Sequence, residues 1–207
     1  RGRGEAVLAG MDGGLDFAGY TKHPAPQTGT ENCVGNNGSL MPVHGRDIMV
    51  QAWYQGGRSV FDFTDSENPT GIAYFDRGPV SESELLSAGY WSTYWYNGYI
   101  YGSEISRGLD VFELTASEHL SQNEINAANL VRYETFNPQE QPRVVWPAAF
   151  VVARAYLDQL IRVDGLAMDR IAEVAAELDV VEAMDDGPSK RAALAELATQ
   201  LWDDARQ

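Results

Sequence analysis

The sequence predicts a mainly β protein with an α-helical tail: a partial β-propeller of about two and a half four-stranded blades, followed by a small helical bundle. Three observations support this prediction. The composition changes near residue 115, short apolar runs alternate with glycine turns before that point, and one hairpin pattern recurs 51 residues further along the chain.

The change in composition near residue 115 indicates a change of architecture. The first 115 residues contain 18 of the 20 glycines and 16 of the 22 aromatic residues, whereas the last 92 contain 17 of the 24 alanines. Glycine turns with aromatic runs are typical of strands, and alanine, leucine and glutamate at wider spacing are typical of helices. We therefore predict propeller blades in residues 1–136 and a helical extension in residues 137–207.

The predicted strands are bounded by residues that favour turns. Asp12-Gly13-Gly14 and Asn97-Gly98 are the strongest hairpin signals, because these residues tolerate a positive φ angle. Gln55-Gly56-Gly57 and Arg107-Gly108 mark two more turns. The strands predicted around these turns lie within residues 7–20, 39–43, 47–54, 58–63, 71–76, 90–96, 99–104 and 109–114.

A repeat decides which all-β architecture these strands build. Residues 54–69, YQGGRSVFDFTDSENP, recur as ISRGLDVFELTASEHL at residues 105–120. At the offset of 51 residues the matching pairs are Val60-Phe61 with Val111-Phe112, Gly57 with Gly108, Thr64 with Thr115, Ser66 with Ser117 and Gly38 with Gly89. A unit of four strands and this length is typical of a propeller blade.

The second unit is interrupted before its fourth strand. Ser121 to Glu124 form a capping box, which predicts a short helix near residues 118–129. The fourth strand of this unit is predicted after the helix, at residues 130–136.

The number of blades predicts an incomplete ring. Residues 5–20 match the last hairpin of an earlier unit, so the chain holds about two and a half blades, whereas a propeller closes with four or more. An open stack would expose an aromatic strand edge. We expect the chain to be the C-terminal portion of a longer protein whose other blades complete the ring; the alternative is a self-contained twisted sheet packed on the helices.

Three amphipathic helices are predicted after residue 146. Their short connections predict antiparallel neighbours, so we interpret the apolar stripes as the core of a small bundle rather than as partner-binding surfaces. Gly165 is the predicted stop of the first helix, and the third is expected to begin near Ser189. The three stripes are Phe150, Ala153, Leu157, Leu160 and Ile161; Ile171, Val174, Leu178 and Val181; and Leu194, Leu197, Leu201 and Trp202.

Charge excludes two classes of partner. The chain carries 15 basic and 30 acidic residues, a formal charge of −15, with no basic face to displace counterions from nucleic acid or an anionic membrane. No apolar run is long enough to span a bilayer. Cys33 is the only cysteine, and we interpret it as a packing residue.

The acidic run DFTDSE at residues 62–67 raises the question of a calcium loop. It lacks the glycine and the terminal glutamate of an EF-hand loop, and Asp65 is replaced by Ala116 in the second copy. Thr64 and Ser66 are kept in both copies, so we interpret the run as a turn in which these hydroxyls bond the local backbone. We predict no metal site and no cofactor for this chain.

No catalytic residue is predicted. The three histidines lack zinc-site spacing, and the sequence contains no HExxH motif, nucleophile elbow or P-loop. Cys33 and His44 are eleven residues apart across a turn, which is a weak basis for a nucleophile pair. The candidate ligand-binding residues are instead aromatic and polar: Asn36, Asn37, Gln51, Trp53, Trp91, Tyr94 and Glu104. Aromatic rings beside amides and a carboxylate suit a protein, peptide or glycan partner, and packing between blades is the alternative interpretation.

Two stretches carry a family resemblance. TENCVGNNGSLMPVHGRDIMVQAWYQGGRSVFDFTDSENPTGIAYFDRGP and GYWSTYWYNGYIYGSEISRGLDVFEL resemble the C-terminal blades of bacterial LVIVD-repeat proteins, and NPQEQPRVVWPAAFVVARAYLDQL resembles their helical extension. The resemblance implies an exported β-propeller with an N-terminal signal in a longer parent. Asn36 stands where such proteins tend to have a histidine, which removes a good metal ligand.

The function expected from these observations is that of an exported or cell-surface β-propeller acting as a non-catalytic binding or scaffold module. The alternative is a propeller enzyme whose metal or catalytic centre is completed by other blades, with Ser39 and Ser92 near a central channel. A secreted or cell-envelope location follows from the resemblance, and the residues themselves leave a cytoplasmic location open.

Overall fold

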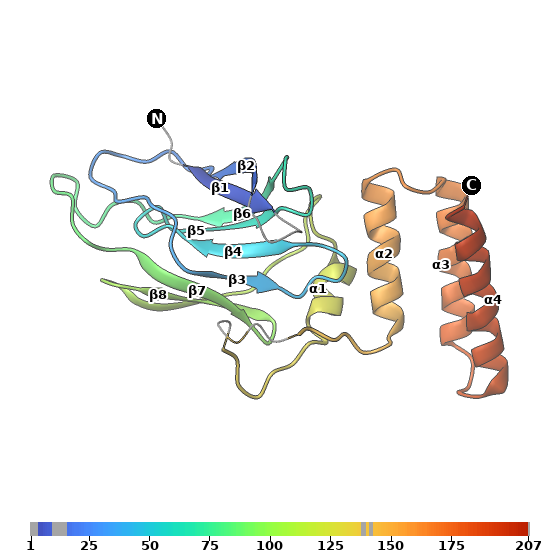
Figure 1. Cartoon of the computed structure of the whole chain (residues 1–207). Helices are drawn as coiled ribbons and strands as arrows, with labels where there is room; N and C mark the ends of the chain where they lie inside the picture. Colours follow the sequence, from blue (N-terminus) through green and yellow to red (C-terminus); the bar gives the residue numbers. More distant parts are fainter. Residues whose placement is uncertain (1–3, 10–15, 138–139, 141–142, 207) are drawn as a thin grey trace. The chain divides into compact units, whose positions relative to one another are not determined.

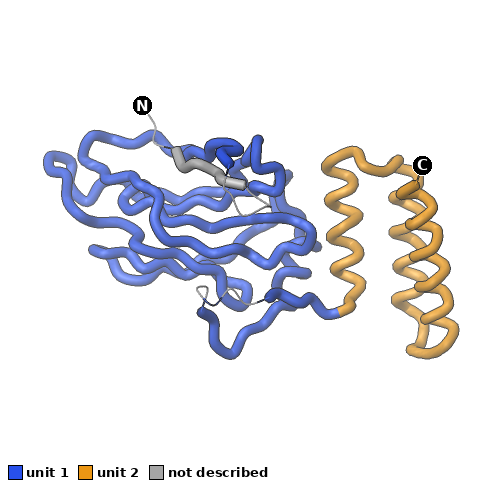
Figure 2. The backbone as a smooth tube through the Cα atoms, viewed as in Figure 1, with its two compact units in different colours: residues 1–147 blue, residues 148–207 orange. Residues whose placement is uncertain are grey.

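The computed structural model describes residues 4–9, 16–137, 140 and 143–206. The chain divides into two compact units, residues 1–147 and 148–207 (Figure 2). The first unit contains all the described strands and one short helix, and the second contains three helices. The chain is therefore mixed β with α, with antiparallel sheets in the first unit and helices in the second.

The β unit is built from three antiparallel sheets (Figure 1). The two-stranded sheet pairs β1 (Gly4–Ala9) with β2 (Asp16–Lys22). The four-stranded sheet has the order β3 (Gly38–Met41), β4 (Ile48–Ala52), β5 (Arg58–Asp62) and β6 (Thr70–Phe75). The three-stranded sheet has the order β7 (Tyr90–Tyr96), β8 (Tyr99–Glu104) and β9 (Gly108–Phe112). The turn predicted at Asp12-Gly13-Gly14 lies outside the described residues.

The hairpin repeat is present in the strand pairing. Val50 pairs with Val60 in the β4–β5 hairpin, and Tyr101 pairs with Val111 in the β8–β9 hairpin, so the two registers are related by the predicted offset of 51 residues. Gly57 and Gly108 take left-handed conformations in the two turns, with φ of 84° and 95°. Only a residue without a Cβ adopts these angles without strain, which explains why both copies keep the glycine.

The offset of 51 residues fails for the first strand of each sheet. Ser39 pairs with Val50, but the partner of Tyr101 is Tyr94, which is 55 residues after Ser39. The cause is the turn length: Asn97-Gly98, with φ of 49° and 97°, closes a two-residue turn between β7 and β8, whereas residues 42–47 connect β3 to β4. The sequence match of Gly38 with Gly89 is therefore not a structural match.

The predicted fourth strand at residues 130–136 is wrong, because this segment is irregular. The backbone of this segment forms hydrogen bonds with side chains at the β7–β8 turn rather than with the backbone of a neighbouring strand. The Tyr133 amide donates to Asn97 Oδ1 at 2.9 Å, and Asn97 Nδ2 donates to the Tyr133 carbonyl at 3.0 Å. The Tyr96 hydroxyl donates to the same carbonyl at 2.9 Å.

The predicted short helix is confirmed as α1 (Gln122–Ala128), with both hydrogen bonds of the capping box formed between Ser121 and Glu124. Glu124 is fully buried and also accepts from Arg46 Nη1 at 2.8 Å. Arg46 binds Asp62 at 2.6 Å and donates to the His119 carbonyl at 2.8 Å. This buried cation therefore ties the loop after β3 to the end of β5 and to α1.

The main core lies between the four-stranded and three-stranded sheets and is closed by α1. Its members are buried apolar side chains from both sheets, from the helix and from the segments beside them: Met41, Val43, Ile48, Val50, Val60, Trp95, Ile100, Leu120, Ile125, Ala128 and Val131. Gln51, Ser59 and Phe61, on the opposite face of the four-stranded sheet, are buried too. Next to this sheet, the ring of His23, which follows β2, lies 5.5 Å from the ring of Trp53, which follows β4.

The α unit contains α2 (Phe150–Arg162), α3 (Met168–Glu182) and α4 (Pro188–Asp204), with α3 packed against both others. The predicted stripe of α3 is buried throughout, and Leu157 and Leu197 complete its core with Val174 and Leu178. Ile161, Leu194 and Trp202 are exposed, so their assignment to the core is wrong. Asp164, with φ of 52°, takes the left-handed position after α2 that the sequence assigned to Gly165.

Among the described residues, none of the helices has the length and apolar character that crossing a bilayer requires.

Candidate functional site

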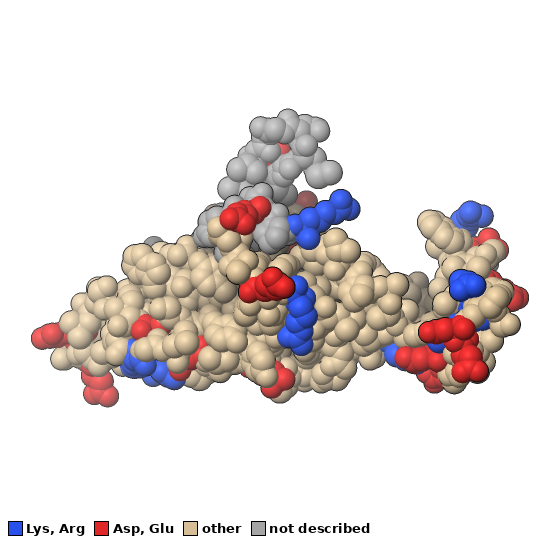
Figure 3. All heavy atoms as spheres, turned by 90° about the horizontal axis from the view of Figure 1, so that it is seen from below, with Lys and Arg blue, Asp and Glu red and all other residues tan. Residues whose placement is uncertain are grey.

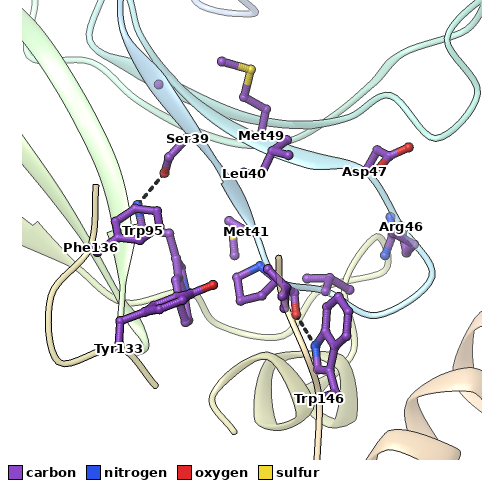
Figure 4. A pocket seen from close by; sticks show the side chains of 14 residues that line it. Ser39, Leu40, Met41, Arg46, Asp47, Met49, Trp95, Tyr133, Phe136 and Trp146 are labelled. Atoms are coloured by element: carbon purple, nitrogen blue, oxygen red, sulfur yellow. Dashed lines mark hydrogen bonds between the residues drawn. The ribbon is translucent and has the colours of Figure 1, made fainter. Parts of the chain in front are cut away.

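The candidate site is a pocket of about 570 Å³ in the β unit (Figure 4). It follows β3, which is an edge strand, and the turn after it. The opposite wall comes from Trp95 on β7 and from the irregular segment that precedes the α unit. Its lining is aromatic and aliphatic apart from Ser39, Arg46 and Asp47, and comprises residues 38–43, 46, 47, 49, 95, 133, 136, 144 and 146.

Ser39 joins the two strands that meet at the pocket. Its buried Oγ accepts a hydrogen bond of 2.8 Å from the Trp95 amide, so the hydroxyl links the edge of β3 to the edge of β7. The Trp95 ring is itself 3% exposed and belongs to the core between the sheets. The inner end of the pocket is therefore held rigidly by both sheets.

Trp146 fixes the outer wall. Its Nε1 donates to the Pro42 carbonyl at 2.8 Å, which satisfies the polar edge of the indole and leaves its ring facing apolar neighbours. The Trp146 ring centroid lies 4.4 Å from that of His44. This bond ties the segment around Val144 to the turn that follows β3.

Tyr133 and Phe136 complete the aromatic lining. Their ring centroids are 4.9 Å apart, and Asn97 holds the Tyr133 backbone on both sides. The Tyr133 hydroxyl points into the pocket (Figure 4). Burial raises the pKa of this hydroxyl, so it stays neutral and can donate or accept a hydrogen bond.

Arg46, at the rim, is not available as a ligand-binding cation. Its Nε and Nη2 both donate to Asp62, at 3.0 and 2.6 Å, and Nη1 donates to Glu124 and to the His119 carbonyl. The pocket thus offers aromatic faces and few free polar groups, which suits binding of an apolar group.

None of the seven predicted ligand residues lines this pocket. Gln51, Trp53 and Glu104 are buried and bonded internally. Gln51 Nε2 donates to the Asn36 carbonyl at 3.0 Å, and Trp53 Nε1 donates to Ser59 Oγ at 2.7 Å. For these residues the structure supports the packing interpretation.

Glu104 is the acceptor for a turn. Its carboxylate accepts from the Gly89 amide at 2.7 Å, from the Ser106 amide at 2.8 Å and from the Arg107 amide. A carboxylate that accepts three backbone amides stabilises the β8–β9 turn, so it is committed to structure.

The other four predicted residues lie at the surface or near it. The Asn36 amide donates to the Ala52 carbonyl, and the Asn37 carbonyl accepts from the Ala52 amide, so both asparagines extend the pairing of β3 with β4. Trp91 is 53% exposed and its ring lies edge-on to Tyr54 at 5.8 Å. Tyr94 is half-buried. Among the described residues, a side-chain hydrogen bond joins two of these seven, Gln51 and Asn36.

The acidic run at residues 62–67 is a turn, as predicted, but the carboxylates of Asp62 and Asp65, rather than the hydroxyls, bond the local backbone amides. Asp62 accepts from the Thr64 hydroxyl at 2.6 Å and from Arg46, and Asp65 accepts from the Glu67 amide at 3.0 Å and from Asn68 Nδ2 at 2.9 Å. Within the part of the chain that the structure describes, no group of three His, Cys, Asp or Glu side chains is placed to hold a metal ion.

Sequence reasoning missed Tyr133, Phe136 and Trp146 because they follow the last strand and precede the first helix of the tail. Their signal is an aromatic residue repeated in a segment rich in proline and poor in glycine, between Tyr133 and Pro147. Such a segment has no regular periodicity, so only contacts with distant residues place its rings.

Comparison with known proteins adds no family assignment: no family model, curated protein or solved structure matches this chain.

Proposed function

We propose that this chain is a partial β-propeller that acts as a non-catalytic binding module, exported or at the cell surface, and that it recognises an apolar peptide segment in the pocket beside β3. Three antiparallel sheets in sequence order and a hairpin repeated in register support the propeller architecture. The resemblance to LVIVD-repeat proteins supports export.

The observation that carries the binding proposal is the lining of the pocket. Trp95, Tyr133, Phe136 and Trp146 provide four aromatic rings around about 570 Å³, a volume in the usual range for ligand pockets. Arg46, Ser39 and the Trp146 indole nitrogen already make hydrogen bonds within the protein. A pocket of this kind binds by burial and ring contacts and is not equipped for proton transfer or nucleophilic attack.

A peptide fits this lining better than a glycan does. Glycans present many hydroxyl groups that need polar partners, whereas apolar side chains of a peptide need only the rings and aliphatic groups that the pocket offers.

The test is selection of random peptides displayed on phage against the immobilised chain, followed by fluorescence polarisation with the selected peptides and with labelled cellotetraose as the glycan probe. Enriched peptides are expected to carry Phe, Trp or Leu and to bind with dissociation constants of about 1–100 μM. Leu40 lines the pocket and is 57% exposed, so Leu40→Lys should weaken binding at least about 10-fold without unfolding the protein.

Val180→Lys is the matched control, because Val180 lies on α3 and is 66% exposed. This variant should bind the selected peptides as the wild-type chain does. Peptides that bind Leu40→Lys equally well, or cellotetraose binding that exceeds peptide binding, would overturn the proposal.

A further inference from the structure

The outer face of the three-stranded sheet is exposed although it carries aromatic and aliphatic side chains. Side chains alternate between the faces of a strand, and Ile100, Gly102 and Glu104 of β8 are buried against the four-stranded sheet. The opposite face therefore presents the paired residues Tyr101 and Val111, with Tyr99 beside them. Tyr99 is 44% exposed, Val111 is 51% exposed and Leu109 is 65% exposed.

The repeat identifies what kind of surface this is. At the offset of 51 residues, Tyr99, Tyr101, Leu109 and Val111 correspond to four residues of the four-stranded sheet that share the register of the first hairpin: Ile48, Val50, Arg58 and Val60. All four are buried, with exposed fractions of 0, 0, 3 and 4%. The same face of the hairpin is therefore buried in the first copy of the repeat and exposed in the second.

A sheet covers the equivalent face in the first copy. Val50 and Val60 share a core with Trp95 and Ile100 of the three-stranded sheet, and Arg58 lies between the rings of Tyr90 and Phe112. A surface built on the same register has the spacing and the apolar side chains that another antiparallel sheet would cover.

The distribution of charge is compatible with a second copy of this chain packing on the exposed face of the three-stranded sheet. The strand residues of this face include no ionised side chain, in a chain whose formal charge is −15; they are Ser92, Tyr94 and Tyr96 on β7, Tyr99, Tyr101 and Ser103 on β8, and Leu109 and Val111 on β9. The exposed Arg107 and Glu113 flank it on either side of β9. Two such chains repel one another least where their surfaces are neutral. Figure 3 views the molecule from the side on which β7 and β8 lie in Figure 1, and charged side chains there are scattered between broad uncharged areas.

We propose that this face, defined by Tyr99, Tyr101, Leu109 and Val111, is a self-association surface on which a second copy of the chain packs sheet to sheet. With a two-fold axis through the face, both copies use the same surface, so each buries these residues against the same surface of the other copy. Tyrosine suits such an interface, because its ring is buried while its hydroxyl finds a partner at the rim.

The experiment is sedimentation velocity of the full chain from about 1 μM to about 200 μM, for wild type, Val111→Lys and Leu109→Lys. The wild-type chain is expected to form a dimer within this range. Each substitution should raise the dissociation constant about 100-fold or more, because the two-fold axis brings two lysines into one dry interface. Val180→Lys on α3 is the control and should dimerise as wild type.

Hydrogen exchange at low and high protein concentration locates the interface independently of substitution. Amides of β8 and β9 should gain protection at high concentration, and amides of α3 should not. Circular dichroism checks that both lysine variants stay folded, and either one that folds is sufficient for the test. A wild-type chain that stays monomeric to the highest concentration, or a dimer that persists in Val111→Lys, refutes the proposal.

Discussion

The β4–β5 and β8–β9 hairpins are two copies of one pattern in different surroundings. Both have the same register and a left-handed glycine at the turn. The first hairpin is buried on both faces: Val50 and Val60 pack against the three-stranded sheet, and Gln51, Ser59 and Phe61 on the opposite face are buried too. The second hairpin is buried on one face only. Equivalent positions therefore carry different residues: Trp53 and Glu104, Arg58 and Leu109, Asp62 and Glu113.

The difference teaches that the repeat specifies backbone pairing, and that the neighbours of each copy specify its side chains. Both turns need the glycine, and the core between the sheets uses Val60 from the first copy and Phe112 from the second. The polar residues differ between the copies because each makes hydrogen bonds that only its own surroundings offer. Glu104, for example, accepts hydrogen bonds from the Gly89 and Ser106 amides. Four predictions, three of which compare equivalent positions of the two copies, test this conclusion.

The largest effect is expected from the same lysine substitution in the two copies. Val60 is 4% exposed and Val111 is 51% exposed, at one position of the repeat. Val60→Lys buries an unpaired charge and should lower the free energy of unfolding by more than about 4 kcal/mol, whereas Val111→Lys should change it by less than about 0.5 kcal/mol in the monomer. Urea denaturation followed by tryptophan fluorescence measures both; equal effects would show that the copies do not differ in burial.

Glu104 should be the next most sensitive position. Glu104→Ala leaves three backbone amides without their acceptor and is expected to cost about 3 kcal/mol of unfolding free energy. Glu104→Gln keeps one carbonyl oxygen and should cost about half of that. If both variants were as stable as wild type in urea denaturation, the β8–β9 turn would not depend on this carboxylate.

The sequence predicted most of the β unit because its strands are short, apolar and bounded by glycine turns. It placed β3 to β9 and α1 within a few residues, and it read the acidic run at residues 62–67 correctly as a turn. It failed at residues 130–136, where β-branched and aromatic residues favour a strand but Asn97 binds the Tyr133 backbone instead. That contact joins residues far apart in the chain, and local propensity does not report it.

The candidate site was harder to predict than the fold. The aromatic and amide residues chosen from the sequence are mostly structural, since Trp53 and Gln51 find their polar partners inside the β unit. The rings that line the pocket come from residues 95, 133, 136 and 146, which only tertiary packing brings together. Ser39 was noted as an inner-strand residue, but its bond to the Trp95 amide depends on how two sheets meet.

A third difference between the copies should depend on pH. Although burial opposes ionisation of Asp62, hydrogen bonds from Thr64 and Arg46 hold the pKa of its carboxyl below the ordinary value. Its ionised form therefore stabilises the fold above about pH 4, and this contribution is lost as the pH falls through the lowered pKa. Asp62→Asn should cost about 1–2 kcal/mol at pH 7, and less as the pH approaches 3.

Glu113→Gln is the control for this prediction, because Glu113 is the repeat equivalent of Asp62 and is exposed. Urea denaturation at a series of pH values should give the same stability for Glu113→Gln and wild type throughout. A loss for Asp62→Asn that does not change between pH 7 and pH 3 would assign the effect to packing rather than to ionisation.

The smallest effect, and the one of opposite sign, is expected at Arg58. Its guanidinium lies 4.1 Å from the centroids of both the Tyr90 and Phe112 rings, and its three nitrogens have no hydrogen-bond acceptor in suitable geometry among the described residues. Burial lowers the pKa of Arg58, and the nearby Tyr90 and Asp110 oppose this shift. Gly102 is required beside it, because a Cβ there would lie 2.0 Å from the Arg58 Nη2 atom.

A buried charge without hydrogen bonds loses more in desolvation than it gains, so an apolar side chain of similar length should be tolerated or favoured. Arg58→Met is expected to raise the free energy of unfolding by about 1 kcal/mol, and Leu109→Met, at the equivalent exposed position, to leave it unchanged. Thermal denaturation of the two variants measures the difference. A loss of stability in Arg58→Met would instead mean that the two ring contacts outweigh the desolvation of the guanidinium. In that case the first copy uses a cation to join its sheet to the next one, at the position where the second copy exposes a leucine.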